Sequence, residues 1–262
     1  MDKPVPKYGS RPLFAPLKLI AVGDIHGMAS ELEALLQKIL PIEPGTHLVF
    51  CGDLIDRGPE SPRVLDLITE VYEKYPGQVF VIRGNHDWML QSYCVHGQSQ
   101  WFNFIGPTME QMKQEWGLPD TKPDTIKQVL IDQGIWEWYF DKALPYYESE
   151  EVICTHAPFD YTQLLMYGAN DYEEDFQEEG HEPHFRHLLD RNMDLMWQFA
   201  SEEEKRVDDL VRKFKICGHQ FKHHKRPRIF RGRAYIDTGC GCVAGRPLSA
   251  LVYPGKKVIQ SR

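Results

Sequence analysis

Three short apolar runs, each followed by a segment of helical periodicity, constrain the fold of this chain more than any other feature of its sequence. The apolar runs are residues 19–22, 47–51 and 78–82, and the periodic segments are residues 30–40, residues 61–75 and a stretch that begins near Asp87. A short apolar run bounded by turn residues is typical of a buried strand, and apolar side chains at helical spacing predict an amphipathic helix. Strand and helix units that alternate in this way indicate an α/β sheet.

The other segments predict how the rest of the 262-residue chain is organised. Prolines are frequent in residues 1–16, and proline lacks the backbone N–H that helices and strands use, so we expect an extended arm there. We expect residues 17–262 to form a single domain with helical insertions at about 97–143 and 160–212, the first of them rich in aromatic residues. Short β-rich runs return later in the chain and predict further strands at residues 214–217, 228–230, 234–237, 248–253 and 257–260.

The balance of charge limits the classes of partner. The 30 basic and 38 acidic side chains give a net charge of −8, which argues against a protein that coats nucleic acid through a basic surface. The first residues lack the apolar core of a secretory signal, and no run of about 18 apolar residues is present to cross a bilayer. We therefore expect a cytoplasmic protein that binds neither nucleic acid nor membrane.

The six cysteines are too few and too scattered for a disulfide framework, so we expect reduced thiols. Two of them form the sequence Cys240-Gly241-Cys242, which invites a metal-binding or redox interpretation. A single pair that follows a strand-like run favours structural cysteines instead.

Polar side chains follow each of the three strand-like runs at the point where the run ends. The clusters read Gly-Asp-Ile-His-Gly at residues 23–27, Gly-Asp-Leu-Ile-Asp-Arg-Gly-Pro at residues 52–59 and Gly-Asn-His-Asp at residues 84–87. Two later strand-like runs are followed by His156 and His219. Ligands bind where the carboxyl ends of the strands converge in an α/β sheet, so we expect all of these clusters to surround one site.

The residue types in these clusters point to a metal. Asp24 and His26 are two residues apart, so in an extended segment both side chains leave the same face and can bind one cation. Carboxylate, imidazole and amide oxygen ligands suit manganese, iron or zinc better than a metal that prefers thiolates. A single histidine after a strand is more often structural than functional. The succession of such clusters along the chain is what favours a metal site.

This series of motifs resembles the calcineurin-like metallophosphoesterases, and specifically their phosphoprotein phosphatase branch, which includes bacterial and phage serine/threonine phosphatases. The resemblance covers about residues 18–255. It implies a four-layer α/β fold in which two mixed β-sheets are flanked by helices. It also implies a binuclear metal centre between the loops at the strand ends.

The resemblance implies a role for each polar residue of the clusters. The implied metal ligands are Asp24 and His26 for the first ion, Asn85, His156 and His219 for the second, and Asp53 as the bridge between the two. Manganese is the expected metal, with iron or zinc as alternatives. Two divalent cations, two aspartates and a bridging hydroxide leave a charge of about +1 to attract a phosphate group.

The same resemblance assigns the proton transfer and the binding of phosphate. A metal-bridging hydroxide would attack phosphorus in line, and His86 would donate a proton to the leaving group. Asp56 would hold the His86 imidazole through a charge-assisted hydrogen bond. Arg57 would offer a planar pair of donors to the phosphate oxygens.

The sequence also departs from the family pattern. Bacterial relatives commonly carry a second phosphate-binding arginine in a Trp-x-Arg segment, and the position of that arginine here is Phe199. Arg186, Arg191 and Arg246 are candidates to replace it, and the sequence does not choose among them. The last residue of the Gly-Asn-His-Asp cluster is Asp87, where many protein phosphatases have glutamate.

Three functions are compatible with these residues. A metal-dependent phosphomonoesterase that acts on phosphoproteins or phosphopeptides is the leading hypothesis, and a dinucleoside polyphosphate hydrolase is the alternative. Members of the second class often lack an acid at the position of Asp56, which is present here. A non-catalytic protein-binding scaffold is the third hypothesis, but scaffolds usually lose ligands and none is missing here.

Two charged segments lie outside the motifs. The simpler interpretation of the basic segment 222–233 is a solvated β-hairpin, and the alternative is a lip that binds acidic substrates. The acidic run 171–179 is typical of a solvated surface loop.

Overall fold

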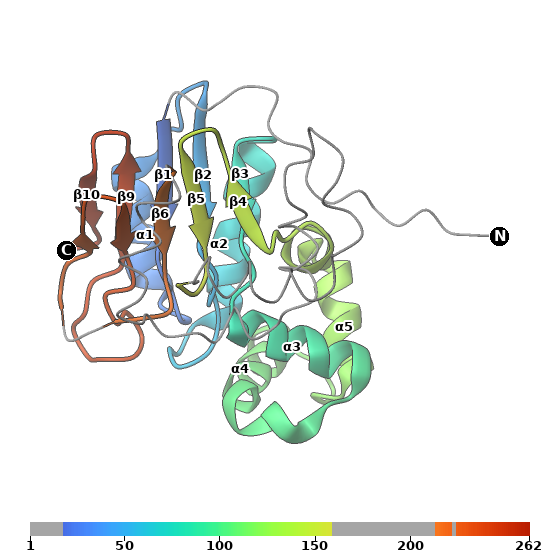
Figure 1. Cartoon of the computed structure of the whole chain (residues 1–262). Helices are drawn as coiled ribbons and strands as arrows, with labels where there is room; N and C mark the ends of the chain where they lie inside the picture. Colours follow the sequence, from blue (N-terminus) through green and yellow to red (C-terminus); the bar gives the residue numbers. More distant parts are fainter. Residues whose placement is uncertain (1–17, 159–212, 222–223) are drawn as a thin grey trace, which may run out of the picture.

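A computed structural model describes residues 18–158, 213–221 and 224–262 of the chain. The predicted arm at residues 1–16, the second predicted insertion at residues 160–212 and the acidic run within it lie outside the described residues. The described part consists of two five-stranded β-sheets that lie face to face, with helices on the far side of the first sheet (Figure 1).

The first sheet contains the three strands predicted from the apolar runs. Its strand order is β10-β9-β1-β2-β3. The strands are β1 (Lys18–Val22), β2 (Thr46–Phe50), β3 (Val79–Val81), β9 (Ser249–Tyr253) and β10 (Lys257–Gln260). β1, β2 and β3 are parallel, and β9 and β10 form an antiparallel hairpin that pairs with β1. Because the three parallel strands run in one direction, the loops that follow them meet at one edge of the sheet.

The second sheet has the strand order β4-β5-β6-β8-β7. Its strands are β4 (Tyr146–Glu148), β5 (Val152–Thr155), β6 (Phe214–Cys217), β7 (Arg228–Ile229) and β8 (Arg233–Tyr235). β5, β6 and β8 are parallel, while β4 and β7 pair antiparallel at the two edges. Both sheets are therefore mixed. β7 lies in the basic segment 222–233, and its antiparallel neighbour β8 begins at the last residue of that segment, Arg233.

Alternate residues of β1 belong to two different hydrophobic cores. Leu19 and Ala21 pack in the core between the two sheets, together with Cys154 and Ile216 of the second sheet. Ile20 and Val22 face the other way, into the core between the first sheet and the helices. A parallel strand covered on both faces carries apolar residues without interruption, which explains the continuous apolar runs in the sequence.

Helices α1 (Ala29–Ile39) and α2 (Ser61–Lys74) connect the parallel strands and cover the outer face of the first sheet (Figure 1). Their buried apolar residues recur at helical spacing, as in Leu32, Leu35, Leu36 and Ile39 of α1. This apolar face is the one predicted from the sequence. Packing against the sheet supplies most of the stability of such helices, since short helices are marginal in isolation.

A group of helices follows β3 and precedes the second sheet. Its members are α3 (Asn85–His96), the 3₁₀ turn η1 (Ser99–Trp101), α4 (Phe102–Glu115), α5 (Pro123–Asp132) and the π-helical turn η2 (Glu137–Asp141). α3, α4 and α5 gather below the sheets in the view of Figure 1. Apolar side chains from this segment, such as Met109 and Trp138, extend the core between the first sheet and the helices.

Within the described residues, no helix is both long and apolar enough to cross a membrane. The two mixed sheets with flanking helices confirm the α/β fold predicted from the sequence, with two corrections at element ends. α3 begins at Asn85, two residues before the expected start near Asp87, so Asn85 and His86 lie in its first turn. β8 ends at Tyr235, although the apolar pattern predicted a strand that continued to Asp237.

Candidate metal centre

The loops after β1 and β2 are joined by backbone hydrogen bonds at the carboxyl edge of the first sheet. The N–H groups of Ile25 and His26 both donate to the carbonyl oxygen of Asp53, at 3.1 and 2.9 Å. Further along, the N–H of Gly58 donates to the carbonyl oxygen of His26 at 3.0 Å. These bonds fix the two clusters relative to each other, as the convergence of parallel strands predicts.

The candidate residues have unusual backbone conformations. His26, Asp53, Asp56, Arg57 and His219 have φ between 48° and 71°. They are five of the six non-glycine residues with positive φ in the part of the chain that the structure describes. A side chain in this region costs roughly 1–3 kcal/mol and persists only where the surrounding structure enforces it, typically at functional sites. The strain therefore marks this group as the candidate site independently of any motif.

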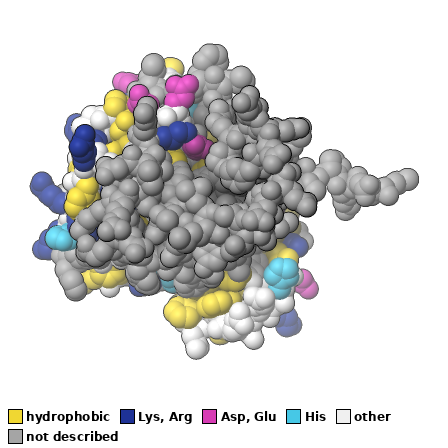
Figure 2. Space-filling model, in the orientation of Figure 1, with side chains coloured by type: hydrophobic (Ala, Val, Ile, Leu, Met, Phe, Trp, Pro, Cys, Tyr) yellow, Lys and Arg dark blue, Asp and Glu magenta, His cyan; other side chains and the backbone are white. Residues whose placement is uncertain are grey.

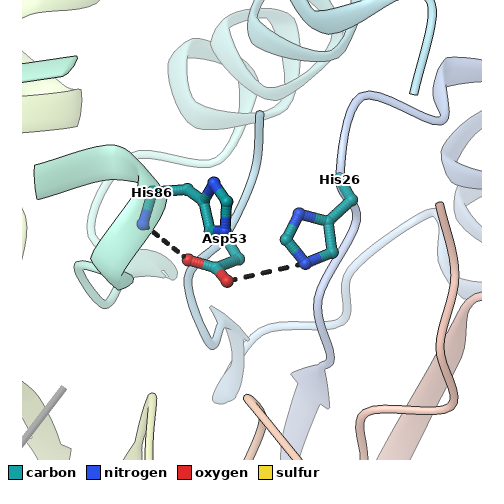
Figure 3. Close-up of side chains that lie close together, drawn as sticks. All are labelled: His26, Asp53 and His86. Carbon is teal, nitrogen blue, oxygen red and sulfur yellow. Dashed lines mark hydrogen bonds and ion pairs between the residues drawn. The ribbon is translucent and has the colours of Figure 1, made fainter. Parts of the chain in front are cut away.

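Asp53 belongs to two groups of potential metal ligands. One group is Asp53 with His26 and His86 (Figure 3), and the other is Asp53 with His156 and His219. Within each group the ligand atoms lie within 4.8 Å of one another. Opposite ligands about 2.1 Å from a cation would be about 4.2 Å apart, so each group is close to the size that a transition metal requires.

The two oxygen atoms of Asp53 face different histidines. Oδ2 lies 3.5 Å from Nε2 of His26, and Oδ1 lies 3.4 Å from Nε2 of His156. Oδ1 also accepts a hydrogen bond from the backbone N–H of His86 at 3.0 Å, which fixes the orientation of the carboxylate. An aspartate placed in this way could supply one oxygen atom to each of the two groups.

Hydrogen bonds at the opposite ring nitrogens orient two of the histidines. Nδ1 of His156 lies 2.8 Å from the carbonyl oxygen of Cys51, and Nδ1 of His26 lies 3.1 Å from that of Ile55. A carbonyl oxygen only accepts, so each Nδ1 carries the proton and each Nε2 has a lone pair facing the site. Backbone carbonyls orient metal-binding histidines in this way.

In the second group, atoms with lone pairs face one another, which is an arrangement that fits a cation. Nε2 of His156 lies 3.0 Å from Oδ1 of Asn85 and 3.1 Å from Nδ1 of His219. The lone pair of His156 and the amide oxygen of Asn85 are both acceptors, so their close approach is favourable when a cation lies between them. The donor set of nitrogen and oxygen atoms fits manganese, iron or zinc.

Burial favours the neutral form of two histidines of the site, His26 and His219. It lowers the pKa of His26 to about 3, although the negative charge of Asp53 acts in the opposite direction. Burial and the neighbouring His156 lower the pKa of His219 to about 4. Neutral imidazoles are the form that binds metals, so these two residues need not lose a proton at neutral pH to act as ligands.

Asp24 lies beside the second group rather than in either of the two groups described above. Its two carboxylate oxygens accept the backbone N–H of His219, each at 3.0 Å. Burial and the charges of Asp237 and Asp53 raise the pKa of Asp24 well above its usual range. A cluster of buried carboxylates repels itself, and bound cations would relieve this repulsion.

Asp237 is a site residue that the sequence analysis missed. It follows β8 and is 6% exposed, and burial raises its pKa to about 6. Its Oδ1 accepts the N–H of Gly239 at 2.8 Å. The available signal was an acid directly after a strand-like run and shortly before a glycine. The apolar pattern instead included Asp237 in the strand.

His86 and Asp56 form a hydrogen-bonded pair beside the metal groups. Nδ1 of His86 lies 2.7 Å from Oδ2 of Asp56, and both side chains are buried. Burial acts to lower the pKa of His86, but the charge of Asp53 and the hydrogen bond to Asp56 outweigh it, so the pKa is raised. Nη2 of Arg57 lies 3.4 Å from Nε2 of His86, which places the guanidinium next to the imidazole.

The structure describes some of the remaining candidates. Cys240 is buried, Cys242 is half-buried, and all six cysteines of the chain are free thiols. Arg246 lies in the described turn between β8 and β9. The other positions considered for the second arginine, Arg186, Arg191 and Phe199, lie outside the described residues.

Comparisons with known proteins agree with this fold. The family whose sequence model matches residues 17–222 is described as calcineurin-like phosphoesterase. The chain is 27% identical over 249 residues to bis(5'-nucleosyl)-tetraphosphatase PrpE (asymmetrical) of Bacillus velezensis, covering 91% of this chain and 90% of that protein.

Two solved structures share the fold. A cold-active protein-tyrosine phosphatase of a psychrophilic Shewanella species has a TM-score of 0.57 at 16% identity and covers 100% of this chain and 87% of its own. A protein serine/threonine phosphatase from Saccharomyces cerevisiae has a TM-score of 0.56 at 16% identity, with coverages of 95% and 77%. The family match covers most of the sequence, so the chain belongs to the calcineurin-like phosphoesterases and is a phosphoester hydrolase.

Proposed function

We propose that the protein is a metal-dependent phosphomonoesterase that hydrolyses phosphoproteins or phosphopeptides. The observation that carries this proposal is the His86–Asp56 pair, joined at 2.7 Å and adjacent to Asp53 between the two ligand groups. The pair supplies a positioned proton donor, and Arg57 beside it supplies a donor pair for phosphate oxygens.

The proposed metal ligands are those named from the sequence. Asp24 and His26 would hold one divalent cation, Asn85, His156 and His219 would hold another, and Asp53 would bridge them. The family uses such a binuclear centre, and the manganese assignment is our proposal. When bound, two cations supply Lewis-acid stabilisation of phosphate charge and lower the pKa of coordinated water.

The protein residues then perform the steps of binding and proton transfer. Arg57 binds and orients the phosphate group through charge-assisted hydrogen bonds. Nε2 of His86 donates a proton to the departing oxygen atom of the substrate, while Asp56 holds the ring at Nδ1 and stabilises its protonated form. Burial of the pair excludes water, which strengthens the hydrogen bond between them.

The proton donor favours an ester with a strongly basic leaving group. The serine or threonine released from a phosphopeptide would leave as an alkoxide, which needs a proton in the transition state. A dinucleoside polyphosphate releases a nucleotide whose terminal phosphate is a weak base and gains little from such a donor. The buried His86–Asp56 pair is therefore most useful for alkyl phosphate esters.

The alternative substrate is a dinucleoside polyphosphate, and two observations favour it. One is the similarity to PrpE, which extends over about nine tenths of both chains. The other is an aromatic surface beside the proton donor: Phe104 is 51% exposed, and its ring centroid lies 6.2 Å from that of His86. Hydrophobic side chains are visible at the surface in the region of α4 in Figure 2. An exposed aromatic ring can stack on a nucleobase.

We also propose a cytoplasmic location. All six cysteines are free thiols, among them Cys240 and Cys242, which only Gly241 separates in the sequence. Thiols remain reduced in the cytosol, whereas extracellular compartments favour disulfides. Fluorescence of a tagged chain in living cells tests this location directly.

One experiment separates the candidate functions. Protein stripped of metal and reconstituted with Mn(II) is assayed with phosphoserine, phosphothreonine and phosphotyrosine peptides and with diadenosine tetraphosphate. We expect kcat/KM to be higher for a peptide by at least about tenfold, which is about 1.4 kcal/mol in the transition state. A preference for the dinucleotide would establish the alternative, and metal binding without turnover of any substrate would favour the scaffold.

The variant His86→Asn adds an internal check. If His86 donates the proton, this variant should lose about 100-fold or more with the phosphoserine peptide and much less with p-nitrophenyl phosphate, whose leaving group is weakly basic. Equal losses with both substrates would contradict the proposed role of His86.

A further inference from the structure

The carboxylate of Asp56 is held by a closed ring of hydrogen bonds. Oγ1 of Thr108, in α4, donates to Oδ1 of Asp56 at 2.5 Å. The Thr108 hydroxyl lies 3.1 Å from Oγ of Ser61, and Ser61 Oγ accepts the backbone N–H of Asp56, also at 3.1 Å. Because a carboxylate only accepts, the Thr108 proton points at Asp56, and the Ser61 proton points at Thr108.

All members of this ring are buried. Thr108 and Ser61 are 0% exposed, and Asp56 is 1% exposed. The two oxygen atoms of Asp56 have different hydrogen-bond partners: Oδ1 accepts from Thr108, and Oδ2 accepts from His86. Without the Thr108 bond the carboxylate could rotate about its Cβ–Cγ bond, and the His86 ring would lose its fixed direction.

A second contact from α4 holds the same loop. Gln111 lies one helical turn after Thr108, and its Nε2 donates to the carbonyl oxygen of Gly58 at 3.0 Å. Its Oε1 accepts the backbone N–H of Ser61 at 2.9 Å. These bonds fix the part of the loop that directly follows Asp56 and Arg57, both of which have positive φ. α4 thus contacts the loop through both Thr108 and Gln111.

We propose that Thr108 is a positioning residue for proton transfer, which it controls through Asp56 and His86. This inference rests on the proposed function, because it takes His86 as the proton donor. Thr108 itself does not touch the reacting atoms. It sets the direction in which His86 points and so determines how well the leaving group is protonated.

The test uses two variants that separate the hydroxyl of Thr108 from its methyl group. Thr108→Val replaces the hydroxyl by a methyl group and keeps the shape, and Thr108→Ser removes the methyl group and keeps the hydroxyl. Thr125→Val is the control, because Thr125 lies in the neighbouring helix α5 and its hydroxyl also donates to a carboxylate, that of Asp120 at 2.6 Å, away from the His86 pair. Each holoenzyme is assayed with a phosphoserine peptide and with p-nitrophenyl phosphate.

We expect Thr108→Val to lower kcat about tenfold for the phosphoserine peptide and less than about twofold for p-nitrophenyl phosphate, with KM unchanged, since a general acid contributes 10²–10⁴-fold. Thr108→Ser should restore kcat, and Thr125→Val should resemble the unaltered protein. Equal losses with the two substrates, a change confined to KM, or failure of serine to rescue would overturn the proposal. Thr108→Ala carries the same expectation if the valine variant does not fold.

A measurement without turnover supplies an independent readout. The Nδ1 proton of His86, shared with Asp56, should give a far-downfield proton resonance in the NMR spectrum of the metal-free protein. We expect this resonance to move or broaden in Thr108→Val and to stay in place in Thr125→Val, and an unchanged resonance in Thr108→Val would overturn the inference. If the wild-type protein hydrolyses neither ester, the proposed function is refuted instead. The NMR comparison of Thr108→Val with the wild type still tests the role of Thr108 in that case.

Discussion

Asp87 provides a quantitative test of what holds the loops of the candidate site in place. Its carboxylate is 0% exposed and accepts four hydrogen bonds. Oδ2 accepts the backbone N–H groups of Asp53 at 2.8 Å and Gly84 at 2.9 Å. Oδ1 accepts the N–H of Leu54 at 3.1 Å and the hydroxyl of Tyr139 at 2.6 Å. One side chain thus joins the loop after β2 to the start of α3 and to η2.

The substitution Asp87→Asn conserves shape but replaces one oxygen by an NH₂ group. The amide would place NH₂ towards Tyr139, whose hydroxyl can rotate and accept, so the N–H of Leu54 would be left facing a donor. An unsatisfied buried N–H costs about 1–3 kcal/mol, and the other bonds lose the strengthening that a charge provides. Together these losses amount to about 3–5 kcal/mol.

A second effect acts in the opposite direction. Burial and the nearby charge of Asp53 raise the pKa of Asp87, so removal of its negative charge relieves an unfavourable burial. We expect the cost of the lost hydrogen bonds to exceed the gain from removing the buried charge, because three of the four donors are backbone groups that cannot move to other partners. The predicted net change is a loss of about 2–4 kcal/mol in the free energy of unfolding.

The assay is urea unfolding of the metal-free protein at pH 7, followed by circular dichroism. The midpoint should fall while the m-value stays constant. Tyr139→Phe is the matched control, since it removes one donor and keeps the charge, and it should cost about 1–2 kcal/mol. If Asp87→Asn is as stable as the unaltered protein, burial of charge outweighs the hydrogen bonds and the reasoning is wrong.

Two further substitutions test other parts of the structure. Burial raises the pKa of Glu31, but hydrogen bonds, chiefly from Arg262, outweigh it and hold the pKa below its usual range. Stability from such a carboxylate is present above its unfolded pKa and disappears as the pH falls through its folded pKa. Glu31→Gln should therefore cost about 1 kcal/mol in urea unfolding at pH 7, and the cost should shrink as the pH falls below the usual pKa of glutamate, about 4.3. A cost that stays constant as the pH falls would contradict this. Gly218→Ala would place Cβ 2.2 Å from Oδ1 of Asp24, so calorimetry should show Mn(II) affinity reduced by about 10–100-fold. Gly255→Ala, which meets no atom within 4 Å, should leave that affinity unchanged, and equal affinities for the two variants would refute the steric argument.

The fold was largely predictable because its strands are buried on both faces. Leu19 and Ile20 are adjacent in the sequence and belong to different cores, so the apolar run is continuous and easily recognised. The end of β8 was less predictable. The apolar residues Ala234, Tyr235 and Ile236 form a run that continues past the last paired residue, because Ile236 is buried between the sheets without being part of the strand.

Side chains in the candidate site differ in how predictable they were. His86 and Asp56 belong to motifs, and the structure brings them to 2.7 Å of each other. Asp237 has no such motif, and it approaches the site only because β6 and β8 are parallel neighbours in the second sheet. Thr108 lies 52 residues from Asp56 in the sequence, and nothing in a threonine within a helix indicates its partner.

The helical segment between β3 and β4 accounts for much of what sequence reasoning could not reach. The parallel strands bring the loops of the candidate site to one edge, but they leave residues such as Asp56 and Asp53 in strained conformations. The strain must be opposed by contacts from elsewhere. Those contacts come from α4, through Thr108, and from η2, through Tyr139 and its bond to Asp87. Strand topology therefore determines where the candidate site lies, and polar side chains of the helical segment determine how its residues are oriented.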